Sequence, residues 1–120
     1  MGKFQELRAW RRAKDLAVYL YQETGTGKFS RDFALRDQLR RAAVSIPSNI
    51  AEGDELGTNK QSINFFHIAK GSATEVLTQA IIAREIGYLD EAAYNHINEE
   101  CTAIAGMLSK LIQARKSRTP

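Results

Sequence analysis

Apolar residues recur at alternating steps of four and three along four stretches of the chain, as they do on the buried face of a helix. Because only short connections separate the stretches, the pattern predicts an all-α fold, an antiparallel up-down-up-down four-helix bundle. We expect one domain over residues 1–115 and a basic, disordered tail over 116–120. The predicted helices span about residues 5–23, 30–55, 58–86 and 91–112.

The second predicted helix combines a proline and an asparagine with this apolar pattern. Its stripe runs from Leu35 through Ile46 to Gly53 and places Asn49 on the inward side. Pro47 removes the amide donor that would reach the Ala43 carbonyl. Since the stripe keeps its phase across the proline, we predict a continuous helix that is kinked there. The alternative, a new helix with the proline in its first turn, stays open.

Residues with known preferences for helix ends mark the boundaries. Ser30 is a candidate N-cap for the second helix, and Gly57 is expected to close it. Thr58 and Gln61 match a capping box at the start of the third helix. Asp90 is well placed to cap the fourth.

Polar residues interrupt the inward stripes of the second and third helices at their middle. Polar groups between packed helices are costly unless they satisfy one another, so we predict a hydrogen-bonded network. Its role is open, because such a network either sets the register between helices or lines a site. The predicted members are Asn49, Ser72, Glu75 and Gln79, joined by Glu52 or Arg41.

The charge is unevenly distributed, although its net value is only +3. Lys and Arg outnumber Asp and Glu by ten to five over residues 1–45 and by four to none over residues 110–120. Residues 46–109 hold three basic against nine acidic side chains. The basic segments are suited to a phosphate backbone or to the acidic face of another copy, and charge alone does not choose between them.

Motifs for catalysis, metals and cofactors are missing from the sequence. Neither histidine follows a glutamate by three residues, as di-iron bundles require, and there is no glycine-rich phosphate loop. Cys101 lies on an apolar stripe and is expected in the core. Glu52 with Glu75 is a possible carboxylate pair, but an internal network explains both more simply. We therefore expect no cofactor, no metal and no enzymatic activity.

Cysteine usage and hydropathy bear on location. A single cysteine cannot form a disulfide within the chain, and no early charged-then-apolar segment has the form of a signal peptide. No apolar run approaches the roughly 18 residues of a membrane span. We expect a cytoplasmic protein without a membrane partner.

Two blocks of the chain carry a family resemblance. Residues 38–53 read QLRRAAVSIPSNIAEG, and residues 67–89 read HIAKGSATEVLTQAIIAREIGYL. With the aromatic and basic first helix, they resemble the small bacterial four-helix-bundle proteins encoded in intervening sequences of large-subunit ribosomal RNA genes. The same superfamily includes the accessory variability protein of diversity-generating retroelements. The resemblance covers nearly the whole chain.

The resemblance implies an antiparallel bundle assembled as a cyclic homopentamer with a basic surface. For the retroelement relatives it implies binding of nucleic acid and of a reverse transcriptase. Unlike those strongly basic relatives, this chain has a small net charge and an acidic middle. The family's motif residues are expected to be structural; in this chain they are Arg41, Pro47, Asn49, Glu52, Gly53, Ser72 and Glu75.

Two hypotheses for function follow. The first is a non-enzymatic oligomeric module that binds RNA or a nucleoprotein partner through a basic surface. The second is a structural scaffold whose basic and acidic faces pair between copies, without a role for nucleic acid. The candidate nucleic-acid-binding residues are Arg8, Arg11, Arg12, Arg36, Arg40, Lys110, Arg115, Lys116 and Arg118.

Overall fold

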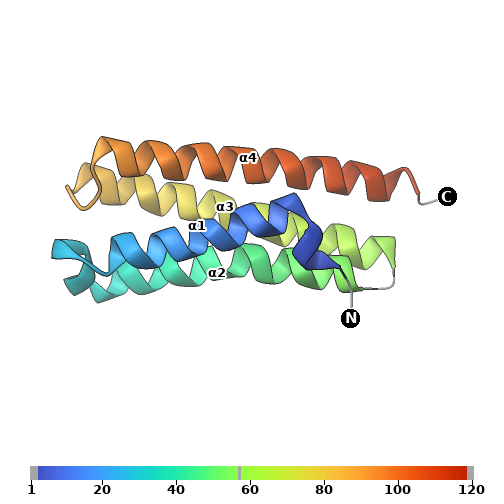
Figure 1. Cartoon of the computed structure of the whole chain (residues 1–120), viewed down its shortest axis with the longest axis horizontal. Helices are drawn as coiled ribbons and strands as arrows, with labels where there is room; N and C mark the ends of the chain where they lie inside the picture. Colours follow the sequence, from blue (N-terminus) through green and yellow to red (C-terminus); the bar gives the residue numbers. More distant parts are fainter. Residues whose placement is uncertain (1–2, 57, 119–120) are drawn as a thin grey trace.

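The computed structural model describes residues 3–56 and 58–118, which form an all-α bundle of four helices (Figure 1). Successive helices pack antiparallel, α2 and α3 make the most extensive contact, and α4 returns to α1. The predicted bundle and its central hairpin are confirmed. The elements are the 3-10 helices η1 (Phe4–Glu6) and η2 (Gly27–Arg31), and the α-helices α1 (Arg8–Thr24), α2 (Phe33–Glu55), α3 (Asn59–Glu85) and α4 (Glu91–Lys116).

The inward face of α2 differs by one position from the predicted stripe. Ile46 and Ile50 are fully buried, whereas Asn49 is half-buried at the edge of the interface. Each helical residue turns the side chain by about 100°, so a stripe centred on Ile50 turns its neighbour partly out of the core. α2 continues through Pro47, and the alternative of a new helix starting there is wrong. The bend at the proline stays a prediction.

The helix ends confirm two of the three predicted caps. Thr58 Oγ1 accepts a hydrogen bond from the Gln61 amide at 3.2 Å, and Asp90 Oδ1 accepts one from the Ala93 amide at 2.8 Å. The cap of α2 is Asp32, whose carboxylate accepts from the Leu35 amide at 3.2 Å. The predicted cap, Ser30, lies in η2 and donates to the Gly27 carbonyl instead. The predicted stop at residue 57 lies outside the described residues.

Two glycines have a clear structural role. Gly53 brings α2 against α3, because a Cβ at this position would lie 2.7 Å from Phe66 Cε1. Gly87 has a φ of 85°, and the hydrogen bonds from its amide to the Arg84 carbonyl and from the Tyr88 amide to the Ala83 carbonyl end α3 in a Schellman motif.

The fourth helix extends further than its apolar pattern indicated. α4 continues to Lys116, four residues beyond the last buried position, Ile112. Within the described residues, no helix has the length and hydropathy needed to span a membrane. The cytoplasmic location stays a prediction.

Candidate functional site

One of the nine candidate RNA-binding cations, Arg12, is paired with a carboxylate, although its side chain is 40% exposed. Its Nε and Nη2 donate to the two carboxylate oxygens of Glu100 at 3.0 and 2.8 Å, which ties α1 to α4. This contact lowers the pKa of Glu100, mainly through the hydrogen bond, and raises that of the arginine. Because the carboxylate cancels its charge, Arg12 is a poor candidate for a phosphate contact.

Two further arginines also face carboxylates. Arg36 Nε lies 2.9 Å from Asp37 Oδ1, and another of its nitrogens donates to a backbone carbonyl of η2. Arg115 donates to Ser62 Oγ at 3.0 Å and lies 3.5 Å from Asp54 Oδ1, so it joins the end of α4 to α2 and α3. These side chains hold elements of the bundle together.

Neutral acceptors hold two more of the candidate residues. Arg11 donates to two backbone carbonyls of η1 at 2.8 and 3.1 Å. Arg40 donates to Thr24 Oγ1 at 2.8 Å and to the Tyr21 carbonyl at 3.2 Å, and it stacks on the Tyr21 ring. Their positive charge is not cancelled, but their donors are largely committed to the fold.

The remaining four candidates, Arg8, Lys110, Lys116 and Arg118, are exposed. Within residues 3–56 and 58–118, no hydrogen bond or ion pair engages the side chain of any of them. Arg8 opens α1, and the other three lie in or just after the last turns of α4. Since α1 and α4 run in opposite directions, the start of α1 and the last turns of α4 lie toward the same end of the bundle (Figure 1).

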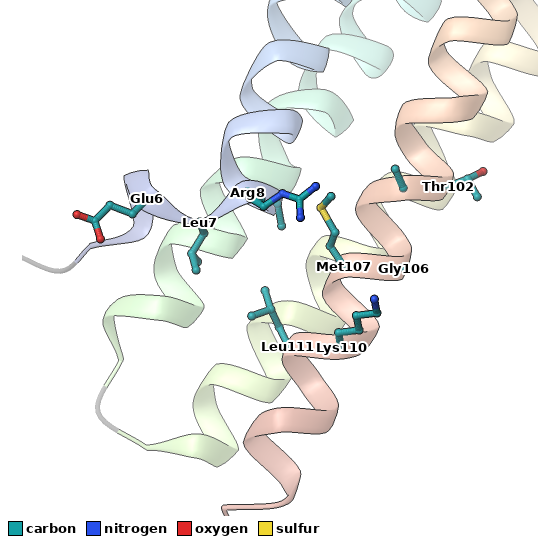
Figure 2. A pocket seen from close by; sticks show the side chains of 10 residues that line it. Glu6, Leu7, Arg8, Thr102, Gly106, Met107, Lys110 and Leu111 are labelled. Carbon is teal, nitrogen blue, oxygen red and sulfur yellow. The ribbon is translucent and has the colours of Figure 1, made fainter.

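Two of these cations share a groove between α1 and α4. The groove has a volume of about 620 Å³, and Figure 2 shows Arg8 and Lys110 beside the apolar side chains of Leu7, Met107 and Leu111. The remaining lining residues are Glu6, Ala9, Thr102, Ala103 and Gly106. The groove therefore combines an apolar surface with two positive side chains that form no ion pair within the described residues.

The predicted polar network has a different membership from the one expected. Asn49 Nδ2 donates to the Ser45 carbonyl at 2.8 Å and to Ser45 Oγ at 3.0 Å, and this hydroxyl lies 2.8 Å from Ser72 Oγ. Asn49 and Ser72 are thus linked through Ser45, which the sequence analysis did not include. Its spacing four residues before Asn49 was the available signal.

The other predicted members stand apart from this chain of hydrogen bonds. Glu52 and Glu75 are exposed, and among the described residues neither their side chains nor that of Arg41 form a hydrogen bond or an ion pair. Gln79 Oε1 is buried but accepts no hydrogen bond. The predicted internal role is therefore corrected for these four side chains.

Several of them instead line an open polar cleft between α2 and α3. The cleft measures about 450 Å³, and six of its seven lining residues are polar. Glu52 does not line it, so the suggested carboxylate pair does not share a site. The lining residues are Gln38, Arg41, Ala42, Ser45, Ser72, Glu75 and Gln79.

Side chains suited to metal binding or nucleophilic chemistry are not assembled at either place. The described part of the chain has no group of three or more His, Cys, Asp and Glu residues that could hold a metal ion. Cys101 is 3% exposed, and burial raises the pKa of its thiol to about 12. The predicted core position of this cysteine is confirmed.

Comparisons with known proteins match this chain to one family model and to a solved structure. The family model described as 23S rRNA-intervening sequence protein matches residues 5–110. A crystal structure of a protein of unknown function from the S23 ribosomal protein family of Bacteroides thetaiotaomicron superposes with a TM-score of 0.80. It is 23% identical, and the match covers 87% of this chain and 97% of the other, which supports the fold. No curated protein matches the chain.

Proposed function

Because this chain belongs to the 23S rRNA-intervening sequence protein family, we propose that it is a non-enzymatic, oligomeric helical-bundle module that binds RNA. The observation that carries the proposal is the groove shared by Arg8 and Lys110. These residues come from opposite ends of the chain, yet they lie together and their charge is not used by the fold. Lys116 and Arg118 extend the positive surface along the end of α4.

Electrostatics favours RNA as the ligand of this end of the bundle. Uncompensated Lys and Arg side chains bind phosphates by displacing condensed counter-ions, without a need for base-specific contacts. Arg11 adds to the local potential, since its partners are neutral carbonyls. The proposed interface is smaller than the nine residues predicted from the sequence.

A gel-shift titration with a structured RNA hairpin tests the proposal. The double variant Arg8→Glu with Lys110→Glu reverses two charges at the groove and should weaken binding at least tenfold. The matched control is Lys28→Glu, an exposed lysine of η2 at the opposite end of α1. Equal affinity for the wild type, the double variant and the control would refute the proposed surface.

Exposed apolar side chains favour a second candidate function, a scaffold formed by copies of this chain. Val18, Tyr21 and Val44 are 42–52% exposed and border a hollow of about 540 Å³ between α1 and α2. Clustered apolar exposure is typical of contact surfaces. The acidic middle of the chain is the complement that a basic end requires in a second copy.

Mass measurement by light scattering tests this second candidate, for which we propose the homopentamer that the resemblance implies. Val44→Glu places a charge on the exposed apolar surface and should release smaller species. Arg8→Glu should leave the mass unchanged if the RNA surface is separate. A monomeric wild-type protein would contradict the oligomer, and an oligomer that does not shift RNA would favour the scaffold alone.

A further inference from the structure

The polar cleft between α2 and α3 contains two opposite charges that the fold leaves unpaired. Arg41 on α2 and Glu75 on α3 both line it, and neither side chain forms a hydrogen bond or an ion pair within the described residues. By contrast, four other arginines of the bundle, Arg12, Arg36, Arg40 and Arg115, are held by intramolecular acceptors. Arg41 and Glu75 are therefore available to groups that enter the cleft.

A third lining residue offers an unused acceptor. The Oε1 atom of Gln79 is shielded from solvent and accepts no hydrogen bond within the described structure. Buried polar atoms in folded proteins nearly always have a partner, so an unpaired one requires an explanation. Because this oxygen is shielded, a ligand with an N–H donor would supply the missing hydrogen bond once the Gln79 amide turns toward the cleft.

After the hydrogen bond between Ser45 and Ser72 has formed, one of the two hydroxyl protons is still free to be donated. The two hydroxyls carry two protons, and the contact at 2.8 Å uses one of them. No other acceptor is found for either hydroxyl in the described residues. Asn49 anchors this pair by donating to both the carbonyl and the hydroxyl of Ser45, so the polar wall of the cleft is fixed in place.

From this arrangement we propose that the cleft binds a free α-amino acid. Arg41 would hold the carboxylate, and Glu75 would accept hydrogen bonds from the ammonium group, joined by Gln79 Oε1 once its amide turns toward the cleft. A ligand with only one of these charges would pair with only one of the two side chains. The cleft volume of about 450 Å³ falls within the range of roughly 300–1,000 Å³ typical of small-molecule sites.

The proposed site is separate from the proposed RNA surface. The cleft lies between α2 and α3, whereas the groove of Arg8 and Lys110 lies between α1 and α4. The antiparallel order of the bundle puts these two helix pairs on opposite sides. Loss of RNA binding in a groove variant therefore does not test the proposed amino-acid binding in the cleft.

Thermal-shift measurements with each of the twenty standard L-α-amino acids, followed by titration calorimetry, test the proposal on the full chain. At least one amino acid should raise the melting temperature, whereas its N-acetylated and amidated forms should bind about tenfold more weakly or not at all. No shift with any of the twenty would overturn the proposal.

Variants that remove one charge each test which side chain binds the carboxylate of the ligand and which binds its ammonium group. Arg41→Gln should remove the preference for the free acid over its amide, and Glu75→Gln should remove the preference over the N-acetylated form. Both side chains are exposed, so the variants should fold, and Arg31→Gln, at an exposed arginine of η2, is the matched control outside the cleft. Unchanged preferences in both cleft variants would place the binding elsewhere and overturn the assignment.

Discussion

Arg12 and Glu100 lie 88 positions apart in the chain, yet the guanidinium of one holds both carboxylate oxygens of the other, at 3.0 and 2.8 Å. The contact joins the first and last α-helices and lowers the pKa of Glu100 below its ordinary value of 4.5. A carboxyl group with a lowered pKa stabilises the fold above that value, and the contribution disappears as the pH falls through the folded-state pKa.

Glu100→Gln should therefore lower the free energy of unfolding by about 1 kcal/mol at pH 7, as expected for a partly exposed two-point ion pair. The difference from the wild type should shrink as the pH is lowered below 4.5, because the wild-type carboxylate is then protonated. Urea denaturation of both proteins at several pH values measures this difference in the free energy of unfolding. Glu99→Gln changes the exposed neighbouring residue and should lower the free energy of unfolding much less. Equal effects of the two substitutions on this free energy would contradict the role of the contact.

Glycines at two positions of the hairpin should respond to alanine in opposite directions. Gly53→Ala should destabilise the protein by about 1–3 kcal/mol, because the added Cβ would lie 2.7 Å from the Phe66 ring. Gly71→Ala meets no atom within 4 Å and should stabilise α3 by about 0.5–1 kcal/mol. Chemical denaturation of both variants provides the comparison. Stabilisation by both changes would mean that α2 and α3 are less closely packed.

Two basic residues at the end of α4 should separate stability from RNA binding. Arg115→Gln breaks the contacts to Ser62 and Asp54 and should lower the free energy of unfolding by about 1–2 kcal/mol. Lys116→Gln should leave stability within about 0.5 kcal/mol of the wild type but weaken RNA binding. Thermal melts measure the stability of each variant, and gel shifts on the same samples measure its RNA binding. A weaker RNA complex without loss of stability in the arginine variant would contradict its structural assignment.

The buried thiol of Cys101 should resist alkylation. Burial raises its pKa to about 12, so almost none of the reactive thiolate is present at neutral pH. Iodoacetamide should label the native protein only slowly and the urea-unfolded protein rapidly. Rapid labelling of the folded protein would show that the core around α4 opens far more readily than its burial implies.

Local sequence patterns predicted the elements of this fold well. The four-three apolar spacing placed four helices, and the short-range chemistry of Thr58 and Asp90 fixed where two of them begin. The cap of α2 was missed because Ser30 and Asp32 are both suitable residues. Ser30 is part of a 3-10 turn that the pattern did not reveal, so α2 begins later and Asp32 is its cap.

Long-range contacts account for most of what the sequence did not predict. A basic helix face has the same composition whether its arginines are free or paired, and the partner of Arg12 lies on α4. A small rotation of α2 buries Ile50 instead of Asn49, and the predicted network becomes the wall of a cleft. Such rotations depend on packing against α1 and α3, which periodicity alone does not specify.

The salt dependence of RNA binding tests the central claim, that cations unused by the fold form the functional surface. The logarithm of the wild-type binding constant should fall linearly with that of the salt concentration, by about 0.7–0.9 per phosphate contacted. Arg8→Gln with Lys110→Gln should make the slope shallower by roughly 1.4–1.8, the contribution of two contacts. An RNA-binding constant that does not change with salt concentration would contradict the account. So would a double variant with the same slope as the wild type.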